Sequence, residues 1–188
     1  MAASVDPAAP VHASALPPAL PPAALWLPGS ALGCYESDAT RRDWLLTPGL
    51  LTQRIREAAG PRFAMNVLHE GAACADGTHV REIDMRCGAE VWLFAHTRVP
   101  AATLAAEPWL GSIGTRTLGE ALAAHDTTLE REPLCFAMFG ADAWLVGRAL
   151  EHARLSAQNL WVRYSAFRAG GAPFDLYEVF LPGMGGHA

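Results

Sequence analysis

The sequence predicts an α+β fold: a single domain in which one antiparallel sheet of about six strands has helices packed on one face. Four strand candidates form two pairs joined by short, glycine-containing turns, 79–87 with 90–99 and 160–168 with 174–181. Such hairpins join antiparallel neighbours, whereas parallel strands need long crossovers that are usually helical. The chain has 188 residues, of which 51% are hydrophobic, so it can bury one core of ordinary size.

A pair of helices is expected before the sheet. Ser37 or Asp38 can cap a first helix that carries the apolar residues 44–46. Pro48 stands where a second helix can begin, and Gly60 is the residue type at which a helix ends.

The remaining elements are predicted from apolar periodicity. Strands alternate apolar and polar residues, whereas helices carry apolar residues three or four positions apart. In chain order, these elements are a strand at 63–70, short helices at 101–110 and 118–124, a strand at 134–139 and a helix at 142–155.

The ends of the chain differ in composition from its centre. Residues 1–36 are rich in Ala and Pro and are expected to form a flexible tail. The domain would then span 37–183, followed by a short tail at 184–188. The sequence contains no run of 18 apolar residues, so no membrane span is predicted, and prolines interrupt the apolar run that a secretory signal would need. We therefore expect a cytoplasmic protein.

The composition excludes several kinds of chemistry. All 14 basic residues are arginine, so neither a lysine Schiff base nor a Walker A phosphate loop can form. The net charge of −5 gives no reason to expect a nucleic-acid partner. His69, His79 and His96 could approach one another across adjacent strands, but no carboxylate or cysteine completes a metal-ligand spacing. We expect no metal site.

Two charged residues fall on apolar strand faces. Side chains alternate across a strand, and in 79–87 Arg81 shares its face with the three apolar residues that follow at odd positions. In 174–181, Glu178 is the single polar residue among the even positions. An unpaired buried charge costs several kcal/mol, so each of these residues needs a partner.

Two interpretations of these charges stay open at this point. Arg81 and Glu178 could meet in a buried ion pair, or one of them could lie partly exposed at a strand end. Alternatively, they line a pocket for a small polar ligand, because Arg binds a carboxylate through two parallel hydrogen bonds. A carboxylate in apolar surroundings can accept a hydrogen bond from a hydroxyl group. Such a pocket suits a ring with a carboxylate at one end and a hydroxyl at the other.

Short motifs are spread in order along the chain from residue 41 to 182. They are Arg41-Arg42-Asp43-Trp44-Leu45-Leu46 with Leu50-Leu51-Thr52 and Arg54, then Arg81-Glu82-Ile83 with Trp92-Leu93, Thr97 and Pro100, then Gly114 with Leu118-Gly119, then Trp161-x-Arg163-x-Ser165, and finally Glu178-x-Phe180-Leu181-Pro182. In order and spacing, this set resembles the chorismate pyruvate-lyases.

The resemblance implies a chorismate lyase-like fold, with helical lids over a buried ligand pocket. It implies a carbon-oxygen lyase without cofactor, active as a monomer, that eliminates pyruvate from its small-molecule substrate chorismate. The product would be 4-hydroxybenzoate, at the first step toward ubiquinone. Arg81 and Glu178 would be the catalytic residues, with Arg81 on the ring carboxylate and Glu178 facing the ring hydroxyl. The Leu118 backbone would contribute to binding near the product carboxylate, and Leu51 would cover the ring.

Four positions depart from the family's pattern. His69 and His96 stand where the family commonly has Arg, Thr117 replaces a Pro, and Tyr164 replaces a second Arg. The segment 140–156 is also longer than in compact members. Chorismate carries two carboxylates, so lost positive charge near the pocket would weaken binding of the enolpyruvyl group.

A second class of function stays open beside the enzyme. A related fold serves as the small-molecule sensing domain of some bacterial transcription regulators, which would bind a carboxylated effector without chemistry. Such domains are usually attached to a basic helix-turn-helix, and the first 40 residues here are too rich in Ala and Pro to form one.

Overall fold

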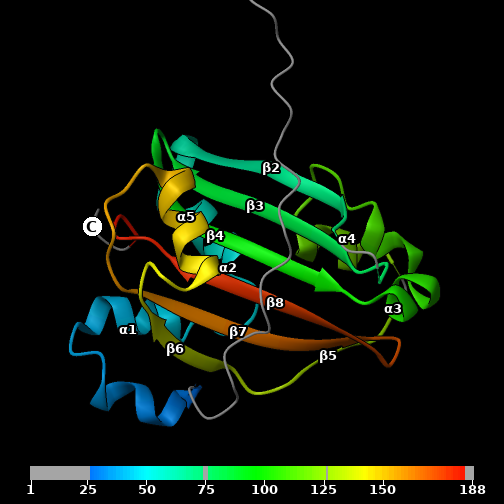
Figure 1. The fold of residues 1–188 in the computed structure, drawn as a ribbon, viewed down its shortest axis with the longest axis horizontal. Coiled ribbons are helices and arrows are strands. Elements are labelled where there is room, and N and C mark those ends of the chain that lie inside the picture. Colours follow the sequence, from blue (N-terminus) through cyan, green and yellow to red (C-terminus); the bar gives the residue numbers. More distant parts are fainter. Residues whose placement is uncertain (1–25, 74–75, 126, 185–188) are drawn as a thin grey trace, which may run out of the picture.

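The protein is described by a computed structural model over residues 26–73, 76–125 and 127–184 (Figure 1). The strands are β1 (Leu27–Pro28), β2 (Phe63–Ala72), β3 (His79–Cys87), β4 (Glu90–Val99), β5 (Leu129–Arg131), β6 (Cys135–Phe139), β7 (Leu160–Ala169) and β8 (Ala172–Phe180). The helices are α1 (Ala39–Leu45), α2 (Leu51–Ala59), α3 (Ala101–Ala106), α4 (Leu118–Ala123) and α5 (Trp144–Ala153), with 3-10 turns η2 (Gly29–Cys34), η3 (Gly60–Arg62) and η4 (Pro108–Gly111).

One antiparallel sheet organises the molecule, as the hairpins predicted. Its order is β1-β6-β7-β8-β4-β3-β2, and β5 pairs with β7 beyond the end of β6. The described chain contributes eight strands to this sheet instead of about six. The two additional strands, β1 and β5, have two and three residues, which is too short for an alternating pattern to be visible in the sequence.

The helix pair before the sheet has the predicted end signals. The Asp38 side chain caps α1 by accepting hydrogen bonds from the backbone N–H groups of Thr40 and Arg41. Gly60 ends α2 with a φ of 54°, a conformation that costs glycine little because it has no Cβ. These two signals fix the residue at which α1 begins and the residue at which α2 ends.

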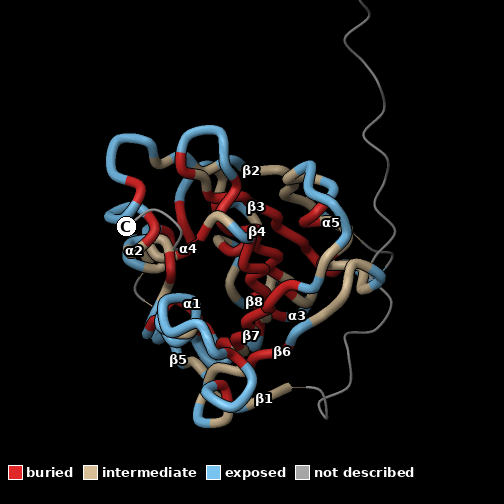
Figure 2. The backbone as a smooth tube through the Cα atoms, turned by 90° about the vertical axis from the view of Figure 1, so that its left-hand side faces the viewer, coloured by how far each residue is buried: buried red, intermediate tan, exposed pale blue. Residues whose placement is uncertain are grey.

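The two faces of the sheet are covered differently (Figures 1 and 2). We define the inner face as the side that packs against α1, α2 and α4, where the larger hydrophobic core lies. The outer face packs against α5, whose Val146, Ala149 and Leu150 join a separate core with strand residues such as Phe94 and Val179. The expectation that helices pack on one face alone was therefore too simple, because α5 covers the opposite face.

The folded region begins earlier than the composition suggested. Leu32, inside the segment 1–36 that we expected to be a flexible tail, is fully buried in the core of the inner face. The same segment contains β1, which pairs with β6. Met184, assigned above to the C-terminal tail, is buried as well. Residues 1–25 and 185–188 lie outside the described residues.

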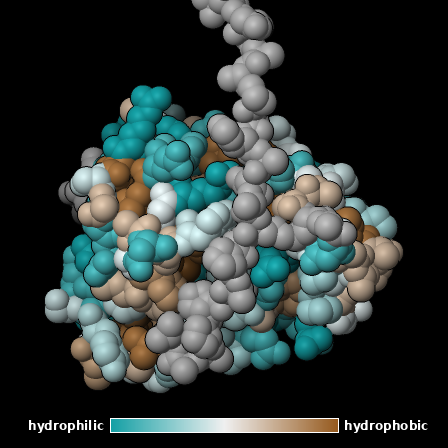
Figure 3. Space-filling model, in the orientation of Figure 1, coloured by the Kyte–Doolittle hydropathy of each residue, from teal (hydrophilic) through white to brown (hydrophobic). Residues whose placement is uncertain are grey.

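The surface on the side of α5 mixes hydrophilic and hydrophobic residues wherever it is described (Figure 3). Within the described residues, none of the helices has both the length and the apolar character needed to cross a membrane.

Candidate active site

The two charges singled out by strand alternation both lie on the inner face. Arg81 lies two residues from Ile83 on β3, and Glu178 lies two residues from Leu176 on β8, so each charge shares its face with an apolar residue of the inner core. Arg81 is 2% exposed and Glu178 is 3% exposed. The charges are therefore buried among apolar side chains of a single face.

Arg81 and Glu178 do not form an ion pair with each other, so that interpretation was wrong. β4 lies between β3 and β8, and Arg81 is in register with Thr97, which is in register with Leu176. Glu178 lies two residues further along β8. Strand order, which no local pattern reports, separates the two charges by two strand spacings.

Arg81 is held by the loop that leads into α4. Its Nη2 donates to the carbonyl oxygens of Gly114 at 3.0 Å and Arg116 at 2.8 Å. Glu70 lies 3.7 Å from its Nε and accepts hydrogen bonds from the backbone N–H groups of Ile113 and Gly114. Burial lowers the pKa of Arg81, and the charge of Glu70 opposes that shift.

The guanidinium of Arg81 still has unused donors. Among the described residues, its buried Nε has no hydrogen-bond acceptor, although Glu70 lies nearby. A buried cation with a free N–H gains when an anion binds, because both the charge and the donor are then satisfied. The geometry thus suits a ligand carboxylate at this end of the inner face.

Glu178 is paired with Arg163, which belongs to one of the motifs above but was not expected as its partner. The Nε of Arg163 donates to its Oε2 at 2.6 Å, and Arg163 is fully buried. The same guanidinium donates from Nη1 to the Thr47 carbonyl at 2.9 Å and from Nη2 toward the Gly49 carbonyl at 3.5 Å. Arg163 therefore connects Glu178 to the loop before α2. Oε1 of Glu178 accepts no hydrogen bond from the described residues.

The two leucines expected near the ligand are each the first residue of a helix. Leu51 begins α2 and Leu118 begins α4, and both are buried in the inner core. A Cβ added at Gly119 would lie 3.1 Å from the Leu50 side chain, so the two helices start close together. The first N–H groups of a helix have no intrahelical acceptor; in α4 the Thr117 side chain accepts from Glu120, which leaves the N–H groups of Leu118 and Gly119 for an anion.

Comparison with known proteins shows to which family the chain belongs. The model of the family described as chorismate lyase matches residues 20–184. The chain belongs to the chorismate lyase family. It is 32% identical over 177 residues to a protein of Pseudomonas putida, covering 86% of this chain and 90% of that protein. It is 37% identical over 162 residues to one of Azoarcus sp. (76% and 84%) and 33% identical over 179 residues to one of Pseudomonas aeruginosa (88% and 95%). All three relatives are named "Probable chorismate pyruvate-lyase".

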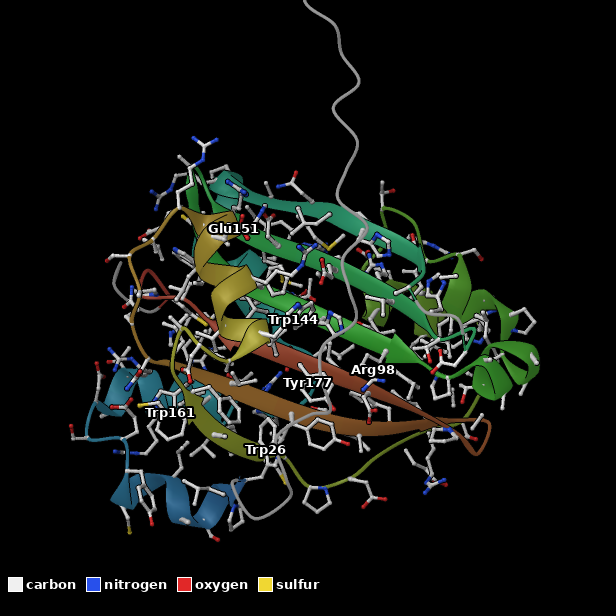
Figure 4. All side chains as sticks on the ribbon, viewed as in Figure 1. Trp26, Arg98, Trp144, Glu151, Trp161 and Tyr177 are labelled. Carbon is white, nitrogen blue, oxygen red and sulfur yellow. The ribbon has the colours of Figure 1, made fainter. Side chains whose placement is uncertain are left out.

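Three of the four departures from the chorismate lyase pattern lie on the outer face. His69 and His96 lie on either side of Glu82 in the sheet, and Tyr164 lies opposite Tyr177. Figure 4 shows Tyr177 and Trp144 on this side, and the ring of Trp144 lies 5.3 Å from that of His96. These substitutions therefore remove no charge from the inner face.

The fourth departure has a local structural role. Thr117 caps α4: its side chain accepts from the Glu120 N–H, and the Glu120 carboxylate accepts from the Thr117 N–H. This capping box replaces a proline with a different helix-start signal. The cap thus fixes the start of α4, where Leu118 lies.

The outer face holds buried charges that the sequence analysis did not recognise. Glu82 accepts from Arg148 at 2.7 and 2.8 Å and lies 3.1 Å from the His96 ring. Asp84 lies 2.6 Å from His152 and is fully buried. Because Arg148 and His152 belong to α5, these contacts attach α5 to β3.

Proposed function

We propose that the protein eliminates pyruvate from chorismate and releases 4-hydroxybenzoate, without a cofactor. The observation that supports this proposal most is the pair of buried charges on the inner face, Arg81 and Glu178, each held by partners of its own. Two separated polar ends with apolar side chains between them match a ring that carries a carboxylate opposite a hydroxyl. Membership of the chorismate lyase family points to the same substrate.

The residues take roles that follow from their contacts. Arg81 binds the ring carboxylate through its unused donors, and the N–H groups at the start of α4, next to Leu118, assist it. Glu178, fixed through Oε2, accepts a hydrogen bond from the ring hydroxyl through Oε1. Leu51 covers the apolar ring from the α2 side.

The reaction needs positioning more than reactive groups. The bond from C3 of the ring to the ether oxygen breaks, C4 loses its hydrogen as a proton, and the departing enolpyruvyl group takes up a proton and becomes pyruvate. Aromatisation of the ring makes the product side strongly favourable. The protein orients the substrate and stabilises the charge that develops on the leaving oxygen. We place this reaction at the first step toward ubiquinone, carried out by a cytoplasmic monomer.

A product assay tests the proposal. The purified protein is incubated with chorismate, pyruvate is followed by a coupled reduction, and the aromatic acid is identified by mass and retention time. Arg81→Ala should abolish ligand binding and Glu178→Ala should slow turnover, while exposed Arg168→Ala serves as a control. Binding without product would instead favour the sensing domain, and unchanged kinetics in both site variants would refute the site.

A further inference from the structure

The proposed substrate has a second carboxylate that no residue above accounts for. With the ring carboxylate at Arg81 and the C4 hydroxyl at Glu178, the enolpyruvyl group on neighbouring C3 projects near the Glu178 end. Its carboxylate needs a cation there, and Arg163 is already engaged by Glu178. This inference rests on the proposed function and asks which residue supplies that cation.

Arg131 lies on the correct face of the sheet. On β5 it is directly in register with Phe167 of β7, whose side chain belongs to the inner core. Directly opposed residues of antiparallel strands project to the same face. The Arg131 guanidinium lies 5.9 Å from the centre of the Phe167 ring, which confirms that its side chain points inward.

Arg131 is also within electrostatic reach of the site. Burial lowers the pKa of its guanidinium, the positive charge of Arg163 lowers it further, and the carboxylate of Glu178 acts in the opposite direction. Mutual repulsion between two guanidinium groups is relieved when an anion lies beside them. Arg163 and Arg131 thus provide two positive charges at an end of the site where Glu178 provides one negative charge.

The hydrogen bonds of Arg131 leave most of its donors free. Nη1 donates to the Gly49 carbonyl at 2.8 Å, and no carboxylate of the described residues lies within 4 Å of the guanidinium. The side chain borders an open groove of about 500 Å³ together with Leu46, Pro48 and Phe136. The Arg131 guanidinium therefore holds the loop before α2 while its side chain borders this groove.

We propose that Arg131 binds the enolpyruvyl carboxylate of the substrate and so distinguishes chorismate from its aromatic product. A guanidinium can bind a carboxylate through two parallel N–H groups while a third continues to donate to Gly49. The bound substrate would then be connected through Arg131 to the loop that leads into Leu51. After elimination, the product 4-hydroxybenzoate lacks this carboxylate and loses the contact with Arg131.

The test compares two ligands across matched variants. Arg131→Gln removes the charge, Arg131→Lys keeps it without the paired donors, and Arg168→Gln is a control on β7 with a similar carbonyl contact. We expect Arg131→Gln to raise KM for chorismate about 10- to 100-fold, as a lost charge-assisted hydrogen bond implies. The Kd for 4-hydroxybenzoate should stay within twofold, and Arg131→Lys should lie between Arg131→Gln and the unmodified protein.

The outcomes separate this inference from the proposed function. Arg81→Gln should weaken both ligands, so equal weakening of both by Arg131→Gln, or of neither, would overturn the role of Arg131. If the unmodified protein forms no pyruvate, the lyase proposal fails. Calorimetric Kd values for chorismate and 4-hydroxybenzoate then make the same comparison without turnover, and a thermal unfolding scan verifies that each variant is folded.

Discussion

Removing Arg163 should be among the most damaging single substitutions in this protein. Its guanidinium is fully buried and donates to the Glu178 carboxylate and to the carbonyls of Thr47 and Gly49. Arg163→Met fills a similar volume but leaves Glu178 as an unpaired buried charge. Loss of one partner of such a pair costs about 3–5 kcal/mol in free energy of unfolding.

The double variant gives the prediction its specificity. Replacing both charges, Arg163→Met with Glu178→Met, removes the unpaired charge and should recover most of the loss, because well-packed apolar side chains can substitute for a buried ion pair. Urea unfolding followed by tryptophan fluorescence measures the four corners of this cycle. At about 2–4 °C per kcal/mol, Arg163→Met alone should lower the Tm by roughly 6–20 °C.

A small effect would refute this reasoning. If Arg163→Met loses less than about 1 kcal/mol, which is the range of exposed ion pairs, then water reaches Glu178 and the pair is not buried. If the double variant is as unstable as the single one, the loss comes from the loop carbonyls and not from the unpaired carboxylate. The exposed substitution Arg168→Gln sets the baseline for a lost surface charge.

Three further predictions concern the surroundings of the site. Burial would raise the pKa of Glu82, but hydrogen bonds from His96 and Arg148 lower it to about 2 from the ordinary 4.5. The stabilisation from ionised Glu82 is therefore present above pH 4.5 and lost as the pH falls toward 2. In Glu82→Gln, the free energy of unfolding should change less with pH across that window. Thr117→Ala should cost about 1 kcal/mol by thermal unfolding, and Thr117→Ser should keep the cap. Glu70→Gln should weaken 4-hydroxybenzoate binding several-fold in calorimetry, because a neutral amide orders the loop before α4 less strongly; unchanged affinity would contradict that role.

Strand alternation identified the buried charges but not their partners. Arg81 and Glu178 each interrupt an apolar row, and such an interruption is visible from neighbouring residues alone. Their partners come from elsewhere: Arg81 contacts the loop before α4, and Glu178 contacts Arg163 of β7. Which strand lies beside which depends on the whole topology, so a pattern within one strand could not show that β4 separates the two charges.

The outer face resisted prediction for a different physical reason. Glu82 and Asp84 make their strand face polar, and a polar strand face usually faces water. Here the same face is buried because α5 carries a matching partner for each carboxylate, Arg148 for Glu82 and His152 for Asp84. Four helical residues advance about 6 Å, and two strand residues advance about 6.6 Å. The two pairs can therefore form together only if α5 runs along β3 in the same direction.

That spacing match also fixes how α5 lies on the sheet. A helix with one apolar stripe could slide along a sheet, whereas two polar side-chain pairs at matched spacing permit a single register. α5 is thus attached to β3 through residues that alternate along the strand with the inner-face residues Arg81 and Ile83. The strand that presents Arg81 to the candidate site is thereby held from both faces, by the inner core on one side and by α5 on the other.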